Sequence, residues 1–123
     1  MIQIYPMHHT RRLTVVRPEA PASYLEVICP EAIRYARSEA EFSLGNTGEL
    51  LDGYLVPSSA LNYKRREDGS VMREENLPGA TYRVVWTPHD EFVDVDLSMT
   101  NTSATDISRL TLSTTVRILA ASL

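Results

Sequence analysis

Two aspartates near the end of the chain have the type and spacing that catalysis or ligand binding requires. Asp94 and Asp96 are two residues apart, so on a β-strand both carboxylates point to one face, about 7 Å apart along the strand. Paired carboxylates can share general acid and base work, or they can bind calcium. The wet face of a sheet that is buried on one side carries the same residue types, so a solvated surface is the alternative interpretation.

A second ionisable group, His89-Asp90-Glu91, lies in a short polar stretch just before these aspartates. Loops at the end of a rigid sandwich often carry binding residues, and histidine can act as an acid or a base near neutral pH. Turn formation alone also explains these residue types. We treat His89, Asp90, Glu91, Asp94 and Asp96 as the candidate ligand-binding residues, and no residue is identified as catalytic.

A small basic cluster near the start of the chain contains His8, His9, Arg11 and Arg12. Neighbouring residues on a strand point to opposite faces, so the two histidines are poorly placed to hold one metal ion. The pattern favours an exposed terminal segment. We therefore expect no metal site and no cofactor.

Aromatic side chains are further candidates, because flat rings can bind sugars through apolar contact and a polar tip. Trp86 shares its strand face with Tyr82 and Val84, which favours packing in the core over ligand binding. Cys29 is the single cysteine, so an intramolecular disulfide is impossible and a reducing compartment is indicated. Its apolar neighbours predict a small buried side chain and not a reactive thiol.

Alternating apolar and polar residues between Thr81 and Leu119 predict the strands that position these side chains. The expected inward residues are Val93, Val95, Leu97 and Met99 in one run and Leu110, Leu112, Val116 and Ile118 in the next. The short connections predict an antiparallel meander with that face hidden from water. Upstream, strands are expected at Ile2 to Tyr5, Leu13 to Arg17 and Tyr24 to Cys29, each followed by a proline, and Asn62 to Glu75 is expected to form a charged, solvent-facing hairpin with Lys64 opposite Arg73.

The segment from Glu31 to Leu44 fits two interpretations. Helical spacing of its apolar residues and a favourable composition predict a short helix over residues 31–38, followed by a strand over Glu41 to Leu44. In the alternative, the whole segment is extended and Ile33 and Tyr35 share one face. The helix is slightly favoured.

Composition and length predict a single all-β domain, residues 1–123, folded as an antiparallel β-sandwich of roughly seven to nine strands. The chain has 43% apolar and 23% charged residues, as an ordinary soluble globular protein does. A net charge of -4 argues against a nucleic-acid partner. No run approaches the roughly 18 apolar residues of a membrane span, and the N-terminus lacks a secretory pattern, so a cytoplasmic protein with no membrane partner is expected.

The stretch from Thr81 to Leu110, about a quarter of the 123 residues, contains Trp86-Thr87-Pro88, Val95 to Ser103 and Ala104 to Leu110. Through these residues it resembles galactose-mutarotase-like sandwiches of sugar metabolism. The resemblance implies a sandwich fold and a carbohydrate ligand. None of the three histidines matches that family's catalytic motifs, so the resemblance implies no catalytic residue.

Three functions are consistent with these patterns. The first is a non-catalytic binding or assembly module, with a carbohydrate as its leading ligand. The second is a small sugar-processing enzyme that uses His89 and the nearby carboxylates. The third is a structural subunit that forms homo-oligomers by pairing exposed sheet edges.

Overall fold

The computed structural model describes residues 1–7, 11–37, 40–44, 63–77 and 79–120, and all regular structure in them is β-strand. The strands are β1 (Gln3–Pro6), β2 (Arg12–Val16), β3 (Ser23–Arg37), β4 (Ala40–Leu44), β5 (Tyr63–Arg65), β6 (Val71–Leu77), β7 (Ala80–Pro88), β8 (Val93–Asn101) and β9 (Ile107–Ala120). No helix in this part of the chain is long and apolar enough to cross a membrane. The predicted all-β class is therefore confirmed.

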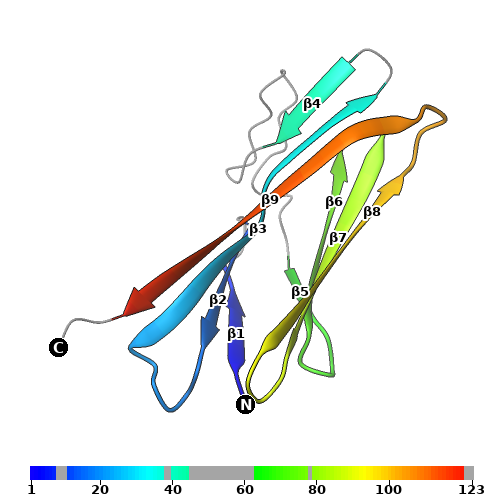
Figure 1. Ribbon diagram of the computed structural model, residues 1–123. Helices are drawn as coiled ribbons and strands as arrows, with labels where there is room; N and C mark the ends of the chain where they lie inside the picture. The colour runs from blue at the N-terminus through cyan, green and yellow to red at the C-terminus, as the bar shows by residue number, and fades with distance from the viewer. Residues whose placement is uncertain (8–10, 38–39, 45–62, 78, 121–123) are drawn as a thin grey trace.

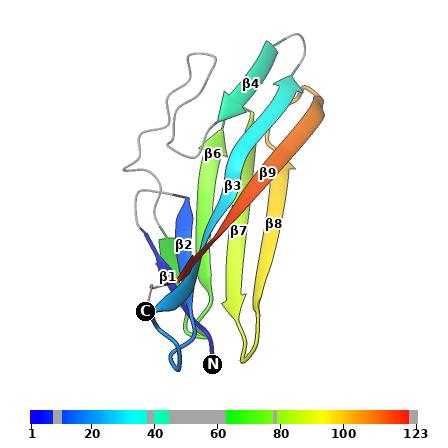
Figure 2. The same cartoon turned by 60° about the vertical axis from the view of Figure 1, so that its left-hand side comes forward.

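Two antiparallel sheets pack face to face, as the sandwich prediction required (Figures 1 and 2). The first sheet has the order β1-β2-β3-β4, with β9 along the other edge of β3, and the second has the order β5-β6-β7-β8. β3 is long enough to pair with β2 through its first part and with β4 through its last part, while β9 follows nearly its whole length. β8 and β9 thus lie on the same side of the sandwich, one in each sheet.

The core is built from the alternating inward residues of both sheets. On β7, Tyr82, Val84 and Trp86 are almost fully buried, which confirms the predicted register of that strand. Ile33 and Tyr35 fill the core from β3. These large apolar side chains account for most of the favourable burial, because buried area sets the hydrophobic contribution.

The helix predicted over residues 31–38 is wrong in the described residues, because β3 runs without interruption from Ser23 to Arg37. Ile33 pairs with Leu44 on one side and with Leu112 on the other, and ladders on both edges outweigh a modest helix propensity. Pro30 does not end the strand, since it falls where the β3–β9 register shifts and no ladder donor is needed. The strand predicted over Glu41 to Leu44 is confirmed within β4.

The prediction that the inward face of β8 and β9 is hidden from water is wrong for part of that face. Val93, Leu97 and Met99 are half-buried and pack against the core, but the exposed residues are Val95, Leu110, Leu112, Val116 and Ile118. Val95 is the direct neighbour of Trp86, yet it is 44% exposed while Trp86 is 0% exposed. On β9, Val116 and Ile118 are 56% and 81% exposed. β8 and β9 are joined at one end of the sandwich and run apart from there (Figure 1).

Candidate functional site

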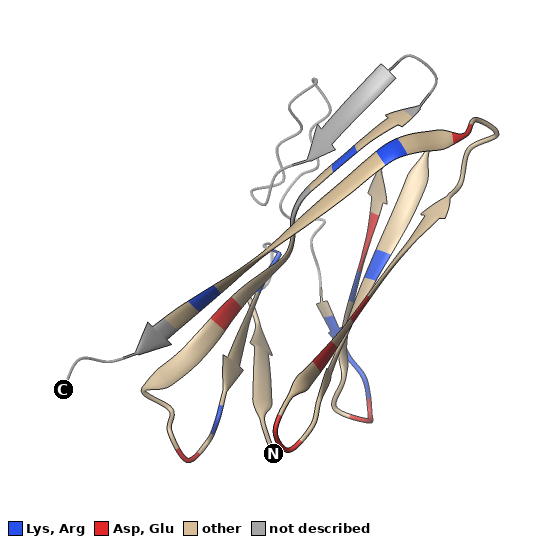
Figure 3. Cartoon of the chain, viewed as in Figure 1, with Lys and Arg blue, Asp and Glu red and all other residues tan. Residues whose placement is uncertain are grey.

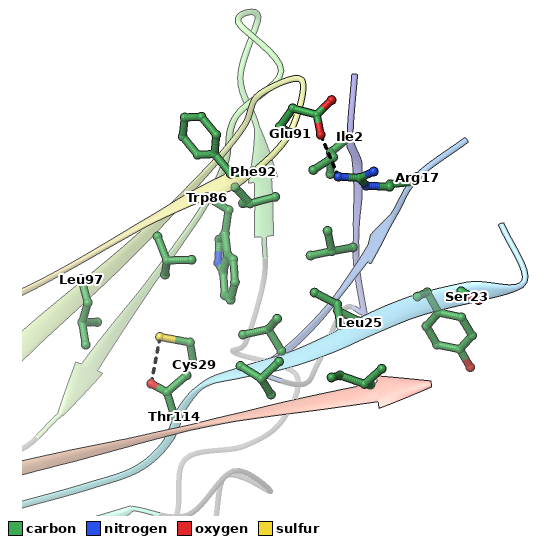
Figure 4. Close-up of a pocket in the computed structure, with 17 residues that line it drawn as sticks. Ile2, Arg17, Ser23, Leu25, Cys29, Trp86, Glu91, Phe92, Leu97 and Thr114 are labelled. Atoms are coloured by element: carbon green, nitrogen blue, oxygen red, sulfur yellow. Dashed lines mark hydrogen bonds and ion pairs between the residues drawn. The ribbon is translucent and has the colours of Figure 1, made fainter. Parts of the chain in front are cut away.

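An apolar groove of about 760 Å³ lies between the two sheets where β8 and β9 diverge. Its walls carry Leu25, Val27 and Cys29 from β3, Val93, Val95 and Leu97 from β8, and Thr114, Val116 and Ile118 from β9, with Trp86 from β7. Figure 4 shows Trp86 and Leu97 on one wall, opposite Cys29, Thr114 and Leu25 on the other. Most polar groups are at the mouth, where Arg17 donates a hydrogen bond to Glu91 at 2.8 Å.

Two polar side chains, those of Thr114 and Trp86, line this groove. The Thr114 hydroxyl contacts the Cys29 sulfur at 3.6 Å, and Cys29 is buried, which agrees with its predicted packing role. The Trp86 indole Nε1 is buried and has no hydrogen-bond partner among the described residues. A buried indole N–H usually has a partner, and leaving a donor unpaired costs about 1–3 kcal/mol.

Each side of the groove ends in a strand edge. Among the described strands, β8 pairs only with β7, and β9 pairs only with β3. The outer edges of both strands therefore present backbone N–H and C=O groups that another strand can pair with. An apolar floor between two such edges is the geometry that an added β-strand or a second sheet would complete.

The predicted residues His89 and Asp94 lie together at the end of the β7–β8 hairpin. The His89 Nε2 is 2.9 Å from an Asp94 carboxylate oxygen, and the histidine ring stacks on Phe92 with centroids 4.3 Å apart. Phe92 is 55% exposed. The group is thus an exposed aromatic ring beside a histidine–carboxylate pair.

The other predicted residues are spread around this hairpin. Asp90 is strongly exposed and lies 4.0 Å from the N-terminal amine, whereas Glu91 is at the groove mouth beside Arg17. Asp96 shares the outward face of β8 with Asp94, and both line a polar hollow of about 520 Å³. The structure therefore unites His89 with Asp94, but it does not bring all five residues into one site.

A buried polar network consists of Tyr63 from β5, Arg73 and Glu75 from β6, Tyr82 from β7, and Arg11 from the segment before β2. The Arg11 Nε donates to a Glu75 carboxylate oxygen at 2.8 Å and to the Tyr82 hydroxyl at 3.1 Å. Arg73 donates to the Tyr63 hydroxyl at 2.6 Å and lies over the rings of Tyr63 and Tyr82. The Arg73 Nε is 3.7 Å from the Glu75 carboxylate.

Charge and burial oppose each other in this network. Burial raises the pKa of Tyr63 to about 12, although the positive charge of Arg73 acts in the other direction. Burial also lowers the pKa of Arg73, and its neighbours Tyr63 and Glu75 oppose that change. Because the network is enclosed, we assign it a structural role.

Hydrogen bonds from this network to main-chain carbonyls tie the two sheets together. Arg73 donates to the carbonyl oxygen of Cys29 in β3. The Tyr63 hydroxyl donates to the carbonyl oxygen of Arg12 at 2.9 Å. These bonds join β6 to β3 and β5 to β2, whereas β8 and β9 form the open side.

Two arginines of this network lie elsewhere than their sequence pattern predicts. Arg11 was expected in an exposed terminal segment and Arg73 in a solvated hairpin, but both are almost fully buried. The hairpin register is also off by one residue, since Arg73 pairs with Tyr63 and not with Lys64. The sequence does contain the relevant signal, because residues 71, 73, 75 and 77 share one face that begins with a valine and ends with a leucine.

No group of three or more potential metal-binding side chains occurs within the residues that the structure describes. His8 and His9 lie outside those residues. Comparison with family models, with curated proteins and with solved structures found no match. The resemblance to galactose-mutarotase-like sandwiches therefore stays a prediction.

Proposed function

We propose that this protein is a non-catalytic assembly module, and that another polypeptide covers its apolar groove. The observation that carries the proposal is the exposure of the inward side chains of β8 and β9, which have strand alternation yet remain in contact with water. Large contiguous apolar surfaces on soluble proteins usually mark interaction sites. Here the surface is flanked by two open strand edges, which provide backbone hydrogen bonds as well as apolar contact.

The groove chemistry favours a polypeptide over a polar small molecule. Its walls are mostly Val, Leu and Ile, and the Arg17–Glu91 ion pair lies at the rim. His89 lines neither the groove nor the polar hollow described above. An enzyme that uses His89 would need this residue to face a substrate-sized cavity, so the geometry supports assembly better than catalysis.

A carbohydrate ligand is a second candidate, and one observation favours it. Phe92 is an exposed aromatic ring, and it lies beside the polar side chains of His89 and Glu91. An apolar ring face next to hydrogen-bonding groups is the arrangement that binds sugars through stacking and polar contacts. Such a ligand would occupy the hairpin end and leave the groove unfilled.

The single tryptophan provides a direct test of both candidates. Trp86 lines the groove, so its indole N–H gives one NMR signal that reports on groove occupancy in isotope-labelled protein. We would follow this signal as protein concentration rises from micromolar to millimolar, and separately as a peptide of alternating valine and threonine is added. A third series would add a panel of sugars.

We expect the indole signal to move saturably in the first or the second series. A Val116→Lys variant should suppress the change, because it places a charge in the groove, whereas Ser113→Lys on the outward face of the same strand should not. A signal that moves in neither series would overturn the proposal. Sugar-dependent shifts at Phe92 and His89, with Trp86 unchanged, would replace it with the carbohydrate candidate.

A further inference from the structure

β9 carries an apolar stripe whose residue types are arranged symmetrically about Thr114. Its inward positions are Leu110, Leu112, Thr114, Val116 and Ile118, with a small polar residue at the centre and two aliphatic residues on each side. Pairing with β3 places Leu112 opposite the buried Ile33 and Val116 opposite Val27, and the second half of the stripe, from Thr114 to Ile118, lines the groove. A symmetric stripe on an open edge is what antiparallel self-pairing requires.

We propose that a second copy of this chain closes the groove, through antiparallel pairing of β9 with β9 about a twofold axis at Thr114. This inference rests on the proposed function and names the partner. In this register Leu112 of one copy lies opposite Val116 of the other, and Leu110 lies opposite Ile118. Directly opposed aliphatic side chains on one sheet face are stabilising pairs.

Charge and the alternation of side chains both favour this register over its neighbours. The charged residues of β9 are Arg109 and Arg117 (Figure 3), and an axis at Thr114 places Arg117 opposite Thr111. A shift of two residues that moves the axis to Ser113 would place Arg117 opposite Arg109, which is destabilising because like charges would face each other. A shift of two residues that moves the axis to Thr115 would place the polar Thr114 opposite Val116. A shift of one residue would place apolar side chains opposite polar ones.

The length of β9 after Arg109 fits the proposed ladder, and its pairing with β3 shifts register opposite Thr114. Arg109 has a positive φ of 52°, which departs from the extended backbone of a strand. The residues from Leu110 to Ile118 follow this irregularity and continue as strand. The nine residues centred on Thr114 are therefore available for pairing.

The edge of β8 is less suited to self-pairing. Asp94 and Asp96 both point outward from it, and inserting charged residues is a common way in which proteins protect an edge strand. An axis at Val95 or at Asp96 would bring carboxylates of the two copies directly opposite each other. β9 has no such pair of like charges around its centre.

Joining the two copies through β9 would also cover the exposed residues of β8. A twofold axis perpendicular to the joined sheet places the second sheets of both copies over the same face. The groove of each copy then opens toward the other copy, so Val95 and Phe92 become part of a shared interior. The exposed apolar surface of the isolated chain is what such a dimer would bury.

Disulfide trapping tests the register directly. A Thr111→Cys/Arg117→Cys variant places the new cysteines opposite each other at two points, and facing residues of antiparallel strands have Cα atoms about 4.5–5.5 Å apart, within the range for a disulfide. In the matched control, Thr111→Cys/Thr115→Cys, the two new cysteines face each other only when the axis is at Ser113. That register is disfavoured because it places Arg117 opposite Arg109. Both variants retain the buried Cys29.

We expect light scattering to give twice the chain mass of 13.8 kDa for the native protein. Under mild oxidation, Thr111→Cys/Arg117→Cys should form a covalent dimer several-fold faster than the control. Val116→Lys should give a monomer and Ser113→Lys should remain dimeric, which separates loss of pairing from loss of folding when both variants keep native circular dichroism.

The other outcomes overturn the inference in distinguishable ways. A dimer that the control traps as fast as the test variant would mean that another surface or register is used, while the proposed assembly function stands. A monomer at every concentration whose Trp86 signal responds to the added peptide would replace the second copy with a different polypeptide. A monomer with no response to the peptide would remove the proposed function as well.

Discussion

Replacing Glu75 by glutamine removes the negative charge of the buried polar network with almost no change in side-chain shape. The carboxylate accepts hydrogen bonds from Arg11 and lies 3.7 Å from Arg73, and all three side chains are at most 1% exposed. The glutamine would leave two buried guanidinium groups without this counter-charge. We therefore expect a large loss of stability.

The size of this loss in the free energy of unfolding follows from the distances between the charges and from their burial. At an effective dielectric constant of about 20, one ion pair at roughly 4 Å is worth about 4 kcal/mol. Removing one partner of a buried pair costs about 3–5 kcal/mol, because the remaining charge is left uncompensated. We expect Glu75→Gln to lower the free energy of unfolding by that amount.

Urea denaturation followed by Trp86 fluorescence provides the assay, and the neighbouring residue provides the control. Glu74 pairs with Arg83, and both side chains are about half exposed, so Glu74→Gln should cost less than about 1 kcal/mol. With a slope of about 1.5 kcal/mol per molar urea, Glu75→Gln should lower the midpoint by roughly 2 M or more. Equal midpoints for the two variants would refute the assignment of Glu75 as the central charge of the network.

Two further predictions concern Tyr63 and Gly69. Burial raises the pKa of Tyr63 to about 12, so the unfolded chain loses this proton near pH 10 while the folded chain keeps it. The free energy of unfolding, measured by urea titration, should therefore fall by about 3 kcal/mol between pH 10 and 12. The same fall in the Tyr63→Phe variant would contradict this explanation. Gly69 has a φ of +86°, and a methyl group at its Cα would meet only open space. Gly69→Ala should therefore lower the free energy of unfolding by about 1 kcal/mol from backbone strain alone, and Gly69→Asn by less. An unchanged thermal melt of Gly69→Ala would contradict the turn geometry.

The face of the sheet to which each side chain points was predictable, because it depends only on the alternation of apolar and polar residues along the strand. The inward residues of β7 and β8 follow from a period of two, and the structure places Tyr82 and Val84 in the core. Arg73 was misplaced because charge was weighed above periodicity. Val71 before it and Glu75 and Leu77 after it share its inward face, and Tyr63 and Glu75 lie close to its charge.

The extension of β3 beyond Pro30 could not be predicted from the neighbouring sequence alone. Ile33 has strand neighbours on both sides, and these lie at Leu44 and Leu112. The second partner is far away in sequence, so a local pattern of alanine, glutamate and arginine favoured a helix. The wrong helix prediction is a case in which tertiary pairing decides between two conformations that the local sequence allows.

The open groove has a more general origin. Alternation states that Val95 and Val116 point to the inner side of a sheet, but it does not state which chain provides the opposite wall. A stripe that completes the core of one chain and a stripe that completes the core of a dimer obey the same period of two. The distinction requires geometry: one side of this sandwich is closed by Arg73 and Tyr63, and the other leaves its apolar stripe 56% exposed at Val116. That asymmetry, and the symmetric order of residues around Thr114, are the reasons to look for the missing wall in a second copy.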